Sequence, residues 1–372
     1  MGTSKNTLDV RLNKEATLLN ISPFFIDNER KEVNFSTNGS EGHAKLSGKI
    51  RTIHSSVHQK VLEGGYCASW VVKLLLSKGY TVHETVRDPD DEKNAHLKKL
   101  DNASTNLQLF KADLLDYGAL SSAISGCQGI FHVASPAPAR DVSDPEKDLL
   151  NPAVKGTLNV LKESKEAGVQ RVVFVSSVAA VMMNPNWPQD KVMDENCWSD
   201  KQYCRTTENW YCLSKTMAES EAFEYAQKSG LDLVSVCPAL VLGPMLQPTI
   251  NASSLVLIKL LKGEQQCVPN RTRYIVDVRD LAEALLLVYK KPNASGRYVA
   301  VDHRAKVKEM VEIMGSQYPN YNYPKQFTDG EEDAVQLSSE KLQRLGWKLR
   351  PLEETLLDSV KYFEEAGLVS RS

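Results

Sequence analysis

Short apolar runs alternate with amphipathic stretches along most of the chain. The segment SWVVKLLLSKG, from Ser69 to Gly79, is typical of an amphipathic helix that a glycine ends, and the YTVHETV that follows is rich enough in β-branched residues for a strand. The exchange continues to residue 177, with helices predicted over DEKNAHLKKL, YGALSSAIS and the stretch before Gly168, and strands over LQLFKADL, GIFHVAS and QRVVFVSS. This order predicts an α/β fold with a doubly wound parallel sheet covered by helices on both faces.

The pattern changes in the second half of the chain. After a further helix that ends near Gly230, LDLVSVCPALVLGP is a nearly continuous apolar run, typical of one central parallel strand. From about residue 245, helices at 253–262, 280–290 and 352–367 alternate with longer polar loops and short strands such as GRYVAV. We predict a doubly wound domain over 60–244 and mainly a smaller substrate lobe over 245–372, above the strand ends where open α/β sheets bind ligands.

Residues 1–59 are polar and follow no sustained period of 3.6 or 2.0. We expect them to form an irregular, mostly disordered N-terminal leader. Acidic and basic residues both occur in this leader, which differs from the acid-poor, Arg-rich composition of a transit peptide. We therefore expect a cytoplasmic protein.

Composition narrows the classes of partner. The 372 residues are 42% hydrophobic and 25% charged, with a net charge of -2, so no polyanion or nucleic-acid partner is indicated. No apolar run approaches the length of a membrane span. The seven cysteines are dispersed, and neither they nor the histidines show zinc-ligand spacing, so we predict reduced thiols and no metal site.

Three polar side chains form the main candidate for chemistry. Tyr211 and Lys215 lie four residues apart on one predicted helix face, and Ser176 and Ser177 end the predicted strand QRVVFVSS. Spacing alone is a weak signal, and the alternative is a packing aromatic, a solvated lysine and a strand-end turn. The order of elements would nevertheless bring the three groups together at the carboxyl end of the sheet.

Such a set suits reduction of a carbonyl by a nicotinamide. A phenol has a pKa of about 10, and a neighbouring ammonium lowers that pKa by favouring the phenolate. As negative charge grows on the carbonyl oxygen, Tyr211 would donate a proton, Ser177 would donate a second hydrogen bond, and Lys215 would tune the phenol.

From about Gly64 to its C-terminus, the chain resembles the plant cinnamoyl-CoA reductase and dihydroflavonol reductase branch of the extended short-chain dehydrogenase/reductase superfamily. The resemblance covers roughly five-sixths of the chain, and its segments together are highly specific. They occur in the family's order and spacing: GGYCASWVVKLLLSKGYTVHETVRDP, FKADLLD, GIFHVASP, VVFVSS, DENCWSD, NWYCLSKTMAE, CPALVLGP and LQRLGWKLRPLEETL.

The resemblance implies an NAD(P)-binding Rossmann-like fold, NADPH chemistry, and a catalytic triad of Ser177, Tyr211 and Lys215. It also implies the cofactor contacts: Gly64, Gly65 and Tyr66 in the phosphate loop, Asp113 and Leu114 beside the adenine, Ala134, Ser135 and Pro136 beneath the cofactor, and Lys215 and Pro238 near the nicotinamide.

The charge after the second strand indicates the preferred cofactor. About twenty residues beyond the glycine loop, where NAD enzymes carry an acid, this chain has Arg87, with Lys93 a little further on. A cation there favours the 2′-phosphate of NADP over the ribose hydroxyl of NAD. The alternative is a surface charge beside Asp88.

The phosphate loop departs from the family pattern. In VLEGGYCASW, Gly65 and Ala68 match two small positions, but Leu62 occupies the position of the first glycine and Glu63 follows it. A carboxylate about 4 Å from a pyrophosphate would repel it by roughly 1 to 4 kcal/mol. Upstream, HSSVHQKVL is too polar for a buried first strand. We predict that unrelated sequence replaces this part, through an alternative first exon or a faulty gene model.

Two classes of function follow. The family implies a small aromatic carbonyl substrate, which is an aldehyde, a ketone or a CoA thioester, and Leu213 and Ser214 make the thioester less favoured. The alternative is a folded, catalytically impaired binding protein, motivated by Leu62 and Glu63.

Cys204 and Cys212 match a cysteine pair of the family and could form a redox-sensitive link, although two reduced thiols are favoured in the cytosol.

Overall fold

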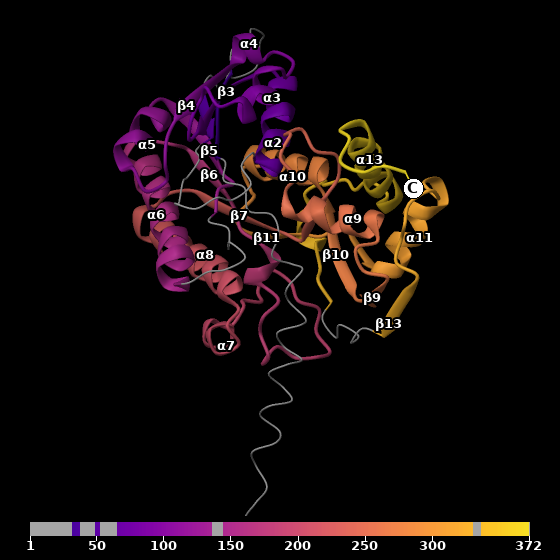
Figure 1. Cartoon of the computed structure of the whole chain (residues 1–372). Coiled ribbons are helices and arrows are strands. Elements are labelled where there is room, and N and C mark those ends of the chain that lie inside the picture. Colours follow the sequence, from indigo (N-terminus) through magenta and orange to yellow (C-terminus); the bar gives the residue numbers. More distant parts are fainter. Residues whose placement is uncertain (1–31, 38–48, 53–64, 136–143, 330–335, 372) are drawn as a thin grey trace, which may run out of the picture.

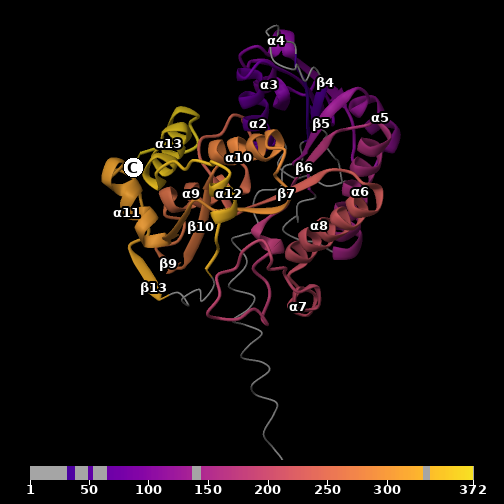
Figure 2. The same cartoon turned by 180° about the vertical axis from the view of Figure 1, so that it is seen from behind.

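The computed structural model of the chain describes residues 32–37, 49–52, 65–135, 144–329 and 336–371. Figures 1 and 2 show two adjoining parts, a large sheet flanked by helices and a smaller group of elements drawn in orange and yellow. No helix in these described ranges is long and apolar enough to cross a membrane.

A parallel sheet with helices on both faces forms the larger part. Its parallel strands lie in the order β4-β3-β2-β5-β6-β7-β11, and β1 pairs antiparallel with β3 and β5. This confirms the predicted doubly wound α/β fold. The strands are β1 (Glu32–Thr37), β2 (Lys49–Thr52), β3 (Tyr80–Val86), β4 (Leu107–Lys111), β5 (Cys127–His132), β6 (Arg171–Val175), β7 (Leu233–Pro238) and β11 (Gly296–Ala300).

Alternate side chains of β6 pack on the two faces of the sheet. Val172 and Phe174 join the core beneath one layer of helices, whereas Val173 and Val175 join the core on the opposite face. The first layer contains α5 (Tyr117–Ile124), α6 (Asn151–Glu166) and α8 (Trp210–Ser229), and the second contains α2 (Tyr66–Ser77) and α10 (Val278–Lys290) (Figure 1).

The apolar run after Gly230 forms two strands instead of the single strand that the pattern predicts. β7 stays in the large sheet, but β8 (Leu240–Leu242) pairs with β10 (Thr272–Asp277) in a second sheet. Pro238 has no backbone N–H to continue a ladder, and the last bond to β11 runs from the Ala239 N–H to the Ala300 carbonyl. The chain therefore changes sheets at this point.

The smaller lobe is built on that second sheet, in which β10 lies between β8 and β12. However, α10 packs on α2, and β11 pairs in parallel with β7, so these two elements belong to the larger part. The other elements of the lobe are β9 (Cys267–Asn270), β12 (His303–Lys306), β13 (Gln326–Asp329), α9 (Ala252–Lys262), α11 (Val307–Gln317), α12 (Glu340–Arg344) and α13 (Leu352–Glu365).

Two strands, β1 and β2, lie in the stretch predicted to be an irregular leader. Each of the two strands pairs with β3 and with β5, and β3 and β5 do not pair directly with each other. Strands β3 and β5 lie inside the sheet, where unpaired backbone groups would be costly, so segments of the leader supply their partners. The candidate first strand HSSVHQKVL lies outside the described residues.

Candidate active site

Ser177 lies just beyond the carboxyl end of β6. Its backbone is extended, its side chain is nearly buried at 9% exposure, and its Oγ accepts a hydrogen bond of 3.1 Å from the Ala179 N–H. Ser177 thereby caps a single helical turn, η3 (Val178–Ala180). The cap holds the hydroxyl at the edge of the sheet where parallel α/β folds bind ligands.

Tyr211 and Lys215 project from the first turns of α8 into the same region. Both are buried, and the Lys215 Nζ lies 5.9 Å from the centroid of the Tyr211 ring. The Lys215 Nζ also donates to the Val175 carbonyl at 3.5 Å, and Tyr211 packs in one cluster with Ala179. The structure thus brings the helix with Tyr211 and Lys215 against the strand and turn that carry Ser177.

A buried histidine next to this group was not predicted as a site residue. Burial lowers the pKa of His132 to about 3, and the nearby Lys215 ammonium adds to the effect. A ring nitrogen of His132 lies 3.1 Å from the Thr157 hydroxyl of α6. His132 is therefore a neutral hydrogen-bonding group at neutral pH. The signal in the sequence was a titratable ring inside the otherwise apolar GIFHVAS.

The N-terminus of α2 offers a place for an anion. Gly65 is its N-cap, no side chain caps the helix, and no acidic residue lies in its first turn. Backbone N–H groups and the positive end of the helix dipole together favour a phosphate there. Gly64, Leu62 and Glu63 lie outside the described residues.

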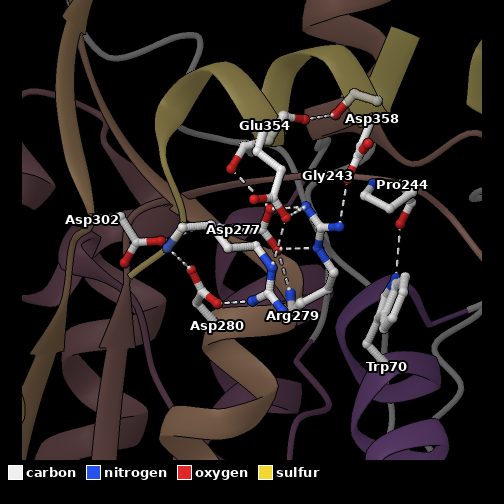
Figure 3. Close-up of polar contacts among 12 residues, drawn as sticks. Trp70, Gly243, Pro244, Asp277, Arg279, Asp280, Asp302, Glu354 and Asp358 are labelled. Atoms are coloured by element: carbon white, nitrogen blue, oxygen red, sulfur yellow. Dashed lines mark hydrogen bonds and ion pairs between the residues drawn. The ribbon is translucent and has the colours of Figure 1, made fainter. Parts of the chain in front are cut away.

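Tyr66 contributes its backbone to this helix start, while its side chain serves packing. The ring is fully buried, and its hydroxyl donates to the Gly243 carbonyl at 2.8 Å. One turn later, the Trp70 Nε1 donates to the Pro244 carbonyl at 2.8 Å (Figure 3). These two bonds fix α2 against the turn that follows β8, so packing and a hydrogen bond occupy the Tyr66 side chain.

The two cations predicted for a 2′-phosphate occupy different settings. Arg87 follows β3 directly and is half-buried. Lys93 is exposed in the short turn η1 (Glu92–Asn94), where its Nζ lies 3.5 Å from an Asp91 carboxylate oxygen. Arg87 is therefore the better placed of the two to meet a ligand at the strand end.

The residues predicted to flank an adenine also differ from each other. Asp113 is partly exposed after β4, and its carboxylate accepts the Leu115 N–H at 2.9 Å. Leu114 is 1% exposed, and a Cβ placed at Gly156 of α6 would lie 3.0 Å from its side chain. Packing therefore occupies the Leu114 side chain, and Asp113 is the more accessible of the pair.

The remaining predicted contacts follow two neighbouring strands. Ala134 and Ser135 are buried small residues after β5. Pro238 is buried at the end of β7, opposite Ala300 of β11. Pro136 lies outside the described residues. Ala134 and Ser135 have small side chains, as expected where a cofactor would approach the backbone.

Cys204 and Cys212 are both present as free, buried thiols. Cys204 lies on α7 (Lys201–Thr206), and burial raises its pKa to about 12. Burial also raises the pKa of Cys212 well above its ordinary value, with Cys204 as the second cause. Both thiols are therefore protonated at neutral pH, which disfavours attack by a thiolate.

These positions fit a phosphorylated dinucleotide laid along the carboxyl edge of the sheet. A cation after β3, small residues after β5 and the Ser177, Tyr211 and Lys215 group beside β6 follow one another along this edge, and the start of α2 adds an anion-attracting helix end. The arrangement can bind a nucleotide phosphate at one end and handle a proton at the other.

Comparisons with a family model and with individual relatives agree on one family. The chain matches the model of the NAD dependent epimerase/dehydratase family over residues 63–301. It is similar to cinnamoyl-CoA reductase 1 of Petunia hybrida, at 46% identity over 321 residues that cover 86% of this chain and 95% of the relative. It is also similar to tetraketide alpha-pyrone reductase 1 of Arabidopsis thaliana, at 38% identity with coverage of 82% and 94%.

Two solved structures with the same fold are reductases. Vestitone reductase from alfalfa (Medicago sativa L.) superposes with a TM-score of 0.71 at 29% identity, covering 82% of this chain and 97% of that one. A yeast methylglyoxal/isovaleraldehyde reductase in complex with NADPH gives a TM-score of 0.71 at 27% identity, covering 82% and 98%.

Proposed function

Because the chain belongs to the NAD dependent epimerase/dehydratase family, we propose that it is an NADPH-dependent oxidoreductase that reduces the carbonyl group of a small aromatic substrate. The observation that carries the proposal is the packing of the buried Tyr211 and Lys215 against the end of β6, where Ser177 caps η3. The similarity to cinnamoyl-CoA, vestitone and aldehyde reductases supports the same activity.

In the proposed reaction, three side chains act on the carbonyl oxygen. NADPH, when bound, supplies the hydride for the carbonyl carbon. As charge develops on the oxygen, Tyr211 transfers its phenolic proton to it and the Ser177 hydroxyl donates a hydrogen bond. The Lys215 ammonium favours the phenolate that Tyr211 becomes. Burial of Tyr211 and Lys215 excludes water, which strengthens these electrostatic effects.

The cofactor preference rests on the residues at the start of the sheet. Arg87 would bind the 2′-phosphate of NADPH through its guanidinium, and the N-terminus of α2, with Gly64 and Gly65, would receive the pyrophosphate. Asp113 would lie beside the adenine, and Ala134, Ser135 and Pro238 would pass close to the nucleotide.

The substrate we propose is an aromatic or phenylpropanoid-type aldehyde or ketone, with a CoA thioester as a further candidate. Leu213 is buried directly after Cys212 and packs in the same cluster as Tyr211. Leu213 and Ser214 replace the pair next to the catalytic tyrosine of lignin-type reductases, which favours the smaller carbonyl substrates.

Cofactor titration tests the proposal directly. Purified full-length protein is titrated with NADPH and, for comparison, NADH, and nucleotide fluorescence is followed. We expect micromolar binding of NADPH, much weaker binding of NADH, and turnover of cinnamaldehydes, phenylacetaldehyde or cinnamoyl-CoA. A folded sample that binds neither nucleotide would contradict the proposal.

A cofactor-impaired binding protein is the second candidate, and one observation favours it. β2 ends at Thr52 and α2 begins only at Tyr66, whereas a dinucleotide turn joins strand and helix closely. The double substitution Leu62→Gly and Glu63→Ala separates the candidates. If turnover appears only in this variant, the fold is intact and the loop limits activity. Equal turnover in wild type would remove the second candidate.

A further inference from the structure

A fully buried carboxylate lies beneath the proposed catalytic group. Glu219 is 0% exposed on α8, four residues beyond Lys215 and eight beyond Tyr211, so it shares their helix face. Its Oε1 and Oε2 accept hydrogen bonds of 3.0 Å and 3.1 Å from the Arg297 guanidinium of β11. A two-point contact of this kind fixes both position and orientation.

The Glu219 and Arg297 pair holds the turn that carries Ser177 on both sides of that residue. The Ser176 hydroxyl donates to the Glu219 Oε2 at 2.8 Å, on the N-terminal side. On the C-terminal side, the Arg297 Nη2 donates to the Ala180 carbonyl at 3.0 Å. Ser177 lies between these two anchors, so the two buried bonds restrain the backbone on both sides of it.

Further bonds tie the same pair to the surrounding elements. The Ser235 hydroxyl of β7 donates to the Glu219 Oε1 at 2.6 Å. The Arg297 Nη1 donates to the Cys197 carbonyl at 2.6 Å, and its guanidinium lies 3.6 Å from the Trp198 ring centroid. The network joins α8 to β7, to β11 and to Ser176, the residue that follows β6, and a fully hydrogen-bonded buried network of this kind restrains its members.

We propose that the buried Glu219 and Arg297 pair is a positioning device that sets the Ser177 hydroxyl relative to Tyr211 and Lys215. The pair acts through the backbone of residues 176–180 and through α8, and it touches no reacting atom itself. This inference rests on the proposed function, because the position of Ser177 matters for turnover only in a carbonyl reductase.

Two serine substitutions test the device with matched chemistry. Ser176→Ala and Ser235→Ala each remove one hydroxyl bond to the same carboxylate, but only Ser176 belongs to the turn with Ser177. We expect Ser176→Ala to lower kcat by about 10- to 100-fold, because small displacements of catalytic groups have effects of this size. The KM for the carbonyl and the Kd for NADPH should change by less than about twofold. Ser235→Ala should retain most of the wild-type kcat.

Hydrogen exchange gives a readout that does not need activity. We expect the backbone amides of residues 177–181 to exchange faster in Ser176→Ala than in the wild type or in Ser235→Ala. Equal losses of kcat in the two variants, or unchanged exchange over 177–181 in Ser176→Ala, would overturn the inference. A wild type that neither binds NADPH nor turns over a carbonyl would refute the proposed function instead, and the exchange comparison would still decide on the positioning device.

Discussion

At the scale of single residues, the site depends on polar groups that the fold keeps in apolar surroundings. Tyr211 and Lys215 are 6% and 4% exposed, and His132 beside them is held neutral by burial. Burying such groups is costly unless they are hydrogen-bonded, and buried titratable groups are concentrated at functional sites. Their concentration at one strand edge is a reason to assign the chemistry there.

Removal of the Tyr211 hydroxyl should separate catalysis from binding. We expect Tyr211→Phe to lower kcat by roughly 100-fold or more, because the proton donor is lost while the ring still fills its place. The Kd for NADPH, measured by nucleotide fluorescence, should stay within about twofold of wild type. The nearby Tyr203→Phe is the control, and a similar loss in both variants would contradict the assignment of Tyr211.

Gly129 in β5 is required by packing. A Cβ at this position would lie 2.7 Å from the Tyr289 Cζ, well inside van der Waals contact, and the ring is confined by the core on that face. We expect Gly129→Ala to reduce the free energy of unfolding by about 1 to 3 kcal/mol in urea titrations. Restoration of stability in the double variant with Tyr289→Leu would identify this contact as the cause. An unchanged midpoint in Gly129→Ala would contradict it.

At the scale of elements, one arginine links the C-terminal helix α13 to the start of α10. Arg279, at the start of α10, donates to the buried Asp277 at 2.8 Å and to Asp358 of α13 at 2.6 Å (Figure 3). Thr355 of α13 also donates to Asp277, at 2.9 Å. The contact thus joins β10, α10 and α13.

Loss of this arginine should weaken the smaller lobe. We expect Arg279→Gln to reduce the free energy of unfolding by roughly 3 kcal/mol, because it leaves the Asp277 carboxylate buried without its cation. Arg344→Gln is the matched control, since Arg344 forms an exposed pair with Glu340 on α12 and should cost less than about 1 kcal/mol. Equal losses in the free energy of unfolding of the two variants, measured in urea, would contradict a larger contribution from the buried pair.

At the scale of the whole molecule, the two sheets meet around acidic residues that repel one another. Asp302 follows β11, and its Oδ2 accepts the Asp277 N–H of the second sheet at 2.8 Å. Burial raises the pKa of Asp302 to about 8, and the Asp280 and Asp277 carboxylates add to the effect, whereas the bond from the Asp277 N–H and the charge of Arg350 oppose it. Asp302 is therefore mainly protonated in the folded protein at neutral pH.

This shifted pKa predicts how stability depends on pH. Between about pH 4 and pH 8 the folded state keeps a proton on Asp302 that the unfolded state releases, so stability falls as the pH rises through this range. Between pH 5 and pH 8, the free energy of unfolding of Asp302→Asn should fall less than that of the wild type. The two slopes should differ by at most about 1.4 kcal/mol per pH unit. Urea unfolding at these two pH values measures the difference, and identical slopes would contradict the shift.

The sequence by itself determined the local elements and the chemical identity of the site. The prediction of a strand over 80–86 agrees with β3, and the glycines at 79, 168 and 230 end helices in the left-handed conformation that favours glycine. These features depend on neighbouring residues alone, so a periodic pattern is enough to find them. The family was also readable from motifs in order.

Only the tertiary structure decided which elements share a sheet and which polar groups share a bond. The run LDLVSVCPALVLGP divides between two sheets because its partners are Ala300 on one side and Ile275 on the other. Glu219 and Arg297 are far apart in the chain, and each is unremarkable in its own segment. Strand ladders and buried ion pairs join distant residues, so their partners are set by the packing of the whole molecule.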